Sequence, residues 1–267
     1  MLVYYIKMKK YILSFIVALV PFSPLTVLAK GHIEYIEMPT KSALNNRPLM
    51  VYVPQDYYDD DDQDICYPVL FLLHGLHGDE TSWTRKGELF TRIDSVIEND
   101  IIRPCIIVMP NTNGGKYIWR AEEHSLFYCV MHYGETKRNN FVDYFSEITN
   151  YVTKHYRISD RCEDHALAGL SNGARKAAEL AILHPMYFGY VGLFSPVLSK
   201  QQVPDRPISD YYITIGVSDI LAANGRRFHK NMDKKGIPHT FCELEGGHDW
   251  PRWRQDILDF LEYAFPK

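Results

Sequence analysis

The segment 169–173, which reads Gly-Leu-Ser-Asn-Gly, contains the serine with the clearest chemical potential. Glycines on both sides let the backbone turn sharply where a side chain would clash, so the serine hydroxyl stands clear of the chain. Such a short pattern also occurs at ordinary turns, so its neighbours matter. A strand pattern ends at Ala168 and a helical pattern covers residues 174–183. This context is typical of a nucleophile elbow and predicts that Ser171 is the nucleophile of a serine esterase.

A serine hydroxyl is a weak nucleophile at neutral pH, so it needs a base and a carboxylate that orients the base. After a nucleophile elbow, the acid and then the histidine follow along the chain. His248 lies between two glycines and a tryptophan in the segment 245–250, and we predict that it is the base. Asp219 follows the strand pattern of residues 211–215 and is the predicted acid. Asp249 ranks second because neighbouring side chains usually point apart.

Ester chemistry also requires backbone donors for the oxyanion that forms on the carbonyl oxygen. The N–H of Asn172, directly after the serine, is one predicted donor. The other is the N–H of Leu76 in the segment 74–78, His-Gly-Leu-His-Gly, where the glycines allow close approach. His74 and His77 offer an alternative metal site, but no third ligand follows at a recognisable spacing. We therefore expect no metal and no organic cofactor.

Other potentially reactive side chains are predicted to be structural. Cys105 lies in an apolar run and is expected to be buried, whereas one disulfide among the other four cysteines stays open. The acidic run 56–64 lacks the alternating ligands of a calcium loop, so it is predicted to be a solvated surface loop. Histidines within or beside regular elements are expected to be capping or buried residues; these are His155, His165, His184, His229 and His239.

The elements that must position these residues alternate along the chain between strand and helix patterns. This alternation predicts an α/β protein with a mostly parallel sheet of about eight strands, helices on both faces and no separate large cap domain. The strand patterns cover residues 32–38, 49–53, 69–73, 106–109, 165–168, 190–194, 211–215 and 240–244, the first two being antiparallel. The helical patterns cover residues 88–99, 141–155, 174–183, 226–235 and 253–263.

One stretch, residues 113–138, is too long for a plain connection and is rich in aromatic residues. Loops of that length are usually functional or disordered, and the aromatic content favours a loop that folds over a site. Aromatic faces stack on sugars and phenolic rings. Trp119 in this loop and Trp250 beside the predicted base are therefore the candidate substrate-binding residues.

Composition limits the partners. The chain has 267 residues, 46% of them hydrophobic, which suits a single catalytic domain over residues 30–267. Its formal net charge of −4 provides no basic surface for nucleic acid. Lysines, an apolar run and a small-residue site within residues 1–29 predict a cleaved signal peptide, with export to the periplasm or the medium. Prolines shorten the apolar run, so no stable membrane insertion is expected after cleavage.

Four motifs occur together in order: residues 67–83, residues 108–111, residues 168–173 and residues 246–250. Together they resemble the esterase D/putative esterase family of α/β hydrolases, which includes tributyrin esterases, S-formylglutathione hydrolases, and feruloyl and acetylxylan esterases of the carbohydrate esterase 1 type. The resemblance implies the α/β-hydrolase fold, with Ser171, Asp219 and His248 as a triad. Family members commonly read GLSMGG, so Asn172 adds a polar amide beside the acyl group and Ala174 adds a methyl group.

The expected activity is hydrolysis of small or carbohydrate esters through an acyl-enzyme. Three alternatives stay open from the sequence. One is an acyltransferase of the same fold, in which a sugar hydroxyl replaces water. Another is a catalytically silent carbohydrate-binding or interaction module, which the departures at Asn172 and Ala174 would suit. The third is a serine peptidase with the same triad, which the resemblance supports little.

Overall fold

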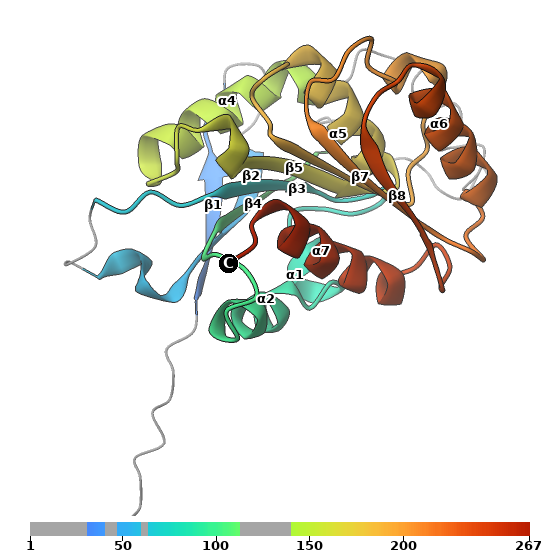
Figure 1. Cartoon of the computed structure of the whole chain (residues 1–267). Helices are drawn as coiled ribbons and strands as arrows, with labels where there is room; N and C mark the ends of the chain where they lie inside the picture. Colours follow the sequence, from blue (N-terminus) through green and yellow to red (C-terminus); the bar gives the residue numbers. More distant parts are fainter. Residues whose placement is uncertain (1–30, 41–46, 60–63, 113–139) are drawn as a thin grey trace, which may run out of the picture.

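One sheet carries all the strands that the computed structural model describes, in residues 31–40, 47–59, 64–112 and 140–267 (Figure 1). The strands are β1 (His32–Met38), β2 (Arg47–Val53), β3 (Val69–Leu73), β4 (Ile106–Pro110), β5 (His165–Leu170), β6 (Tyr190–Phe194), β7 (Asp210–Gly216) and β8 (His239–Leu244). Their order is β1-β2-β4-β3-β5-β6-β7-β8. β2 is antiparallel to β1 and β4, and every later pair is parallel. The predicted strands and the antiparallel entry are confirmed, with ends that differ by up to two residues.

Helices cover both faces of this sheet, as Figure 1 shows. On one face lie α4 (Asn140–His155), α5 (Asn172–Leu183) and α6 (Ala222–Lys234). On the other lie α1 (Ser82–Arg85), α2 (Leu89–Glu98) and α7 (Trp250–Ala264). The three-layer arrangement confirms the predicted fold class. No large cap domain occurs in the part of the chain that the structure describes.

The central strands have no polar face because each of their faces meets an apolar layer. In β3, Phe71 packs into the layer under α4 and α5, whereas its neighbour Leu72 packs into the layer under α7. Parallel strands that are buried on both sides read as continuous apolar runs. This burial fixes the position of the carboxyl ends of β3, β5 and β7, and the loops after these three ends and after β8 carry the predicted site.

α7 begins and packs for local reasons that the sequence shows. The Asp249 side chain caps its first turn by accepting a hydrogen bond from the Arg252 N–H, 3.3 Å away. Ile257, Phe260 and Leu261 follow at helical spacing and are fully buried against the sheet. α6 and α7 begin three to four residues before the predicted helical patterns.

Several predictions concern residues outside the described part of the chain. These are the signal peptide, the long loop with Trp119, and three of the four successive aspartates of the acidic run, residues 60–62. Within the described ranges, no helix combines the length and the apolar composition needed to cross a membrane.

Candidate active site

Ser171 stands at a strained turn between β5 and α5. Its backbone has φ 52° and ψ −114°, a conformation that costs a side-chain-bearing residue about 1–3 kcal/mol. The Ser171 N–H donates to the carbonyl oxygen of Phe194 at 2.8 Å, which ties the turn to the end of β6. The strand–turn–helix arrangement predicted around Ser171 is therefore present in the structure.

The two flanking glycines are required by close backbone contacts on either side of the serine. A Cβ atom at Gly169 would lie 2.5 Å from the carbonyl carbon of Gly173. A Cβ atom at Gly173 would lie 2.5 Å from the carbonyl oxygen of His74 and 2.7 Å from that of Leu73. Both distances are well inside van der Waals contact. The glycines thus allow the start of α5 to pack directly against the ends of β5 and β3.

His248 and Asp219 reach Ser171 from the loops after β8 and β7. The His248 Nε2 atom lies 3.0 Å from Ser171 Oγ, and its Nδ1 atom lies 3.1 Å from each carboxylate oxygen of Asp219. Ser171 and Asp219 are buried, and His248 is largely shielded from solvent. Burial alone would raise the pKa of the Asp219 carboxyl, but hydrogen bonds from His248, Ser195 and the Leu221 N–H lower it below its ordinary value. An ionised Asp219 holds the Nδ1 proton, which leaves Nε2 free to accept the serine proton.

Ser195 supports the acid, and the sequence analysis missed it. Its backbone has φ 48° at the end of β6, its side chain is fully buried, and its hydroxyl lowers the pKa of Asp219. Trp253 Nε1 donates to Ser195 Oγ at 3.0 Å, and the Trp253 ring packs edge-on against His248 with centroids 5.0 Å apart. A serine after an apolar strand carries no distinctive pattern. Only the fold brings Ser195 to Asp219.

The predicted oxyanion donors belong to segments that adjoin Ser171. Asn172 follows the serine in the chain, and a Cβ atom at Gly75, the neighbour of Leu76, would lie 3.5 Å from Ser171 Cβ. The N–H groups of Leu76 and Asn172 donate to no acceptor among the described residues. Asn172 is the first residue of α5, where backbone N–H groups lack helical acceptors and the helix dipole favours negative charge. The Asn172 side chain is turned toward its own helix, because its Oδ1 accepts from Arg175 Nε at 3.2 Å. Its amide oxygen is thus already hydrogen-bonded within α5.

The loop that carries Leu76 is pinned by the buried His74. Its Nδ1–H donates to the Gly75 carbonyl at 2.8 Å, and its Nε2 accepts from the Thr112 N–H at 2.9 Å. Burial and the nearby Lys176 lower the pKa of His74 to about 3, so the ring is neutral. Lys176 Nζ itself donates to the Thr112 carbonyl at 2.8 Å. Both nitrogens of His74 are therefore engaged, which argues against the alternative metal site at His74 and His77.

Two other residues singled out in the sequence, Trp250 and Cys105, belong to the apolar layer between the sheet and α7. Trp250 packs edge-on against Trp83 and Trp253, with ring centroids 5.3 Å and 5.4 Å apart, so its contact with substrate stays a prediction. Cys105 is fully buried as expected, and burial raises the pKa of its thiol to about 12. In the described ranges no disulfide occurs, and Cys129 lies outside them.

The predicted capping and buried histidines differ in their surroundings. His165 is buried and its Nε2 donates to the Ser159 carbonyl at 2.7 Å, whereas His155 is exposed and stacks on Tyr151. His229 and His239 contact each other.

Comparisons relate this chain to known proteins. The Esterase family model, described as "Putative esterase", matches residues 41–210. An endo-1,4-beta-xylanase/feruloyl esterase of Xylanibacter ruminicola is 28% identical over 246 residues, which cover 88% of this chain and 31% of the relative. The chain thus spans about a third of the length of that curated relative.

Two solved structures resemble the chain over most of its length. The CE1 ferulic acid esterase of the anaerobic fungus Anaeromyces mucronatus superposes with a TM-score of 0.75 and 22% identity, covering 90% of this chain and 92% of that one. The S-formylglutathione hydrolase of Staphylococcus aureus gives a TM-score of 0.69 and 22% identity, covering 88% and 97%. At these identities the likeness concerns the fold.

Proposed function

The chain belongs to the Esterase family and has the α/β-hydrolase fold, and we propose that it is an exported serine esterase that acts on acylated carbohydrates. The observation that carries the proposal is the geometry of three side chains: His248 lies 3.0 Å from Ser171 Oγ and 3.1 Å from Asp219. Nucleophile, base and orienting acid are thus within hydrogen-bonding distance of one another.

In the first half-reaction, Ser171 Oγ attacks the ester carbonyl carbon while His248 Nε2 takes the hydroxyl proton. The carbonyl oxygen becomes an oxyanion between the N–H groups of Leu76 and Asn172, and the N-terminus of α5 adds a favourable field. His248 then gives its proton to the departing alcohol. In the second half-reaction, His248 activates a water molecule, which releases the acid from the acyl-enzyme.

The proposed substrates are carbohydrates that carry an aromatic acyl group such as feruloyl. The curated relative from Xylanibacter ruminicola is named as a feruloyl esterase, and so is one of the solved structures. Aromatic side chains near such a site favour sugars and phenolic rings, which stack on their faces. An S-formylglutathione hydrolase has the same fold, so a thioester is included among the test substrates.

The proposed export rests on residues 1–29, where lysines precede a short apolar run and a small-residue site. Expression of the whole chain in a bacterial host, followed by N-terminal sequencing of the periplasmic protein, tests this part. A mature protein that starts at Lys30 supports export. A full-length protein confined to the cytoplasm contradicts it.

An ester panel tests the catalytic part. Residues 30–267 and the Ser171→Ala variant are compared on p-nitrophenyl acetate, p-nitrophenyl butyrate, a feruloylated arabinose and S-formylglutathione. We expect hydrolysis by the unaltered protein, highest kcat/KM on the feruloyl sugar, and loss of turnover in the variant. Equal rates for the two proteins would refute the role of Ser171. Preference for S-formylglutathione would refute the substrate class alone.

A further inference from the structure

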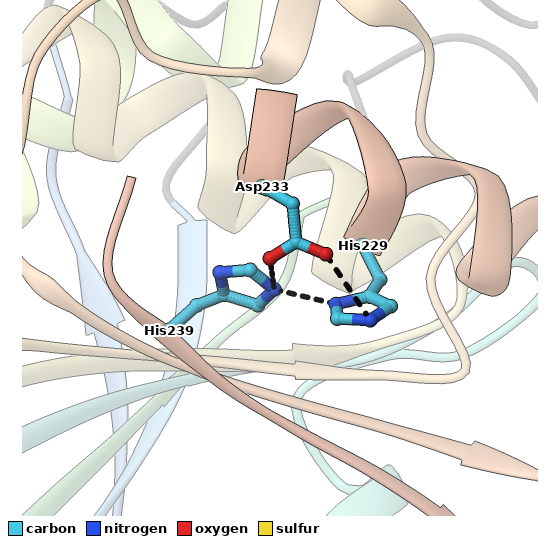
Figure 2. A group of neighbouring side chains, drawn as sticks. All are labelled: His229, Asp233 and His239. Carbon is cyan, nitrogen blue, oxygen red and sulfur yellow. Dashed lines mark hydrogen bonds and ion pairs between the residues drawn. The ribbon is translucent and has the colours of Figure 1, made fainter. Parts of the chain in front are cut away.

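Three side chains that could hold a metal ion converge between α6 and β8 (Figure 2). His229 and Asp233 lie one turn apart on α6, and His239 is the first residue of β8. Each offers a ligand atom, and the three atoms lie within 4.8 Å of one another. His229 Nδ1 is 2.7 Å from His239 Nε2, and the Asp233 carboxylate is 3.4 Å from His229 Nε2 and 4.0 Å from His239 Nε2. Figure 2 shows the carboxylate placed between α6 and both rings.

The orientation of His239 is set by a backbone carbonyl. Its Nδ1 lies 2.8 Å from the Ile237 carbonyl oxygen, which only accepts, so Nδ1 carries a hydrogen. In the neutral ring, the Nε2 lone pair then points into the cluster. Metal-binding histidines characteristically donate their other ring N–H in this way, which fixes the ring and raises its basicity. His239 is therefore arranged as a ligand with its supporting hydrogen bond already made.

The second ring is held by packing on β8. His229 stacks on Phe241 with ring centroids 4.5 Å apart and an angle of 5° between the planes. If His229 is neutral and its Nδ1–H donates to His239, its Nε2 lone pair faces the anionic oxygen of Asp233. That contact is repulsive unless a positive charge is shared among the three side chains. A proton on His229 or a metal cation would supply that charge.

We propose that His229, Asp233 and His239 bind a divalent transition-metal ion of the zinc type. Two imidazoles and one carboxylate match the preference of zinc, whose bonds to such ligands are about 2.0–2.2 Å long. Tetrahedral coordination needs the two ring nitrogens about 3.3 Å apart, so the 2.7 Å contact opens by roughly half an ångström on binding. The His239 side chain is 4% exposed and that of Asp233 is 58% exposed. The site is thus open on one side, where water completes the coordination.

The location indicates a structural role. α6 begins shortly after Asp219, and β8 leads into the loop of His248. The two elements that the cluster connects are therefore the ones that carry the loops of the predicted acid and base. His239 lies at the amino end of β8, whereas His248 follows its carboxyl end. A bound ion would join the last turn of α6 to the start of β8, away from the reacting atoms. The ion would stabilise the fold without taking part in ester hydrolysis. The proposed metal site therefore does not depend on the proposed substrate.

Zinc binding to the untagged protein, freed of metal with EDTA and dialysed, tests the site. Isothermal titration with ZnCl₂ should show one site that Asp233→Asn and His229→Gln each weaken at least tenfold. His155→Gln, which removes an exposed histidine from α4, should leave the affinity unchanged. At zinc concentrations of about one hundred times the dissociation constant, Tm should rise by about 5 °C or more in the unaltered protein. MgCl₂ should produce no such rise, because Mg²⁺ prefers oxygen ligands.

Three outcomes overturn the proposal. The first is the absence of zinc binding, which would leave a proton as the shared charge. The second is binding of equal strength in the unaltered protein and in both cluster variants, which would place zinc elsewhere, for example on the free thiols. The third is a Tm rise of equal size in Asp233→Asn. Because Asp233 is exposed, this variant should fold, and its circular dichroism spectrum checks that it does.

Discussion

Replacing Gly173 by alanine should separate the catalytic geometry from overall stability. The added Cβ would lie 2.5 Å from the His74 carbonyl oxygen, whereas carbon–oxygen contacts settle at about 3.3 Å or more. The elbow and the loop of Leu76 must therefore move apart by roughly 0.8 Å. Leu76 follows His74 by two residues, so the shift reaches a proposed oxyanion donor directly.

The expected loss of stability is small and the expected loss of activity is large. Forcing a methyl group into a packed site costs about 1–3 kcal/mol, and the better helix propensity of alanine offsets about 1 kcal/mol. Tm should thus fall by only a few degrees. A displacement of about 1 Å can cost roughly 10²-fold in rate, and loss of one oxyanion donor costs about 10²–10³. We predict that kcat of Gly173→Ala falls about 10²-fold.

Gly225→Ala is the matched control. Gly225 is also buried in a helix, but its Cβ would lie 3.4 Å from Ile215, an ordinary contact. This variant should gain up to about 1 kcal/mol and keep its activity. Rates on p-nitrophenyl butyrate and thermal melts of both variants complete the assay. A Gly173→Ala protein with kcat within about threefold of the unaltered protein would refute the reasoning.

Four further substitutions probe the triad acid and the residues around the triad. Asp219→Asn should lower kcat roughly 10⁴-fold by favouring the wrong tautomer of the base, whereas Asp249→Asn should keep its helix cap and nearly full activity in the same rate assay. Ser195→Ala should lower kcat/KM about fivefold and move the acidic limb of its pH profile upward, since Asp219 loses a hydrogen bond worth about 1 kcal/mol. Burial lowers the pKa of His74 to about 3 in the folded protein, whereas in the unfolded chain this histidine is protonated below about pH 6.5. The free energy of unfolding therefore decreases as the pH is lowered below about 6.5. His74→Gln should remove about 2 kcal/mol of the stability lost between pH 7.5 and 5 in urea titrations; an unchanged loss would contradict this.

The sequence predicts those parts of the fold that depend on local patterns. Continuous apolar runs such as residues 69–73 identify strands buried on both faces, and the segment 169–173 identifies the turn at Ser171, because glycine spacing and neighbouring elements are local. The order of acid and histidine along the chain then pointed to Asp219 and His248, which the structure brings to Ser171. Asp249, the second candidate for the acid, caps α7 through the Arg252 N–H.

Contacts that depend on tertiary packing could not be predicted in this way. Ser195 and Asp219 follow different strands, and only the order β6-β7 brings their side chains together. The sequence predicts capping or buried roles for His229 and His239, because each lies within or beside a regular element. One belongs to α6 and the other to β8, so no local pattern links them. Their meeting with Asp233 depends on how α6 packs on β8, which no local spacing specifies.

The central claim is that Ser171 is the nucleophile of the site and that His248 and Asp219 activate it. Mass spectrometry of the intact protein after treatment with a fluorophosphonate, followed by peptide mapping, tests this most directly. We predict a single adduct on the peptide that contains Ser171, formed much more slowly in Asp219→Asn and absent from Ser171→Ala. An adduct on another residue, or an equal yield in Ser171→Ala, would contradict the claim.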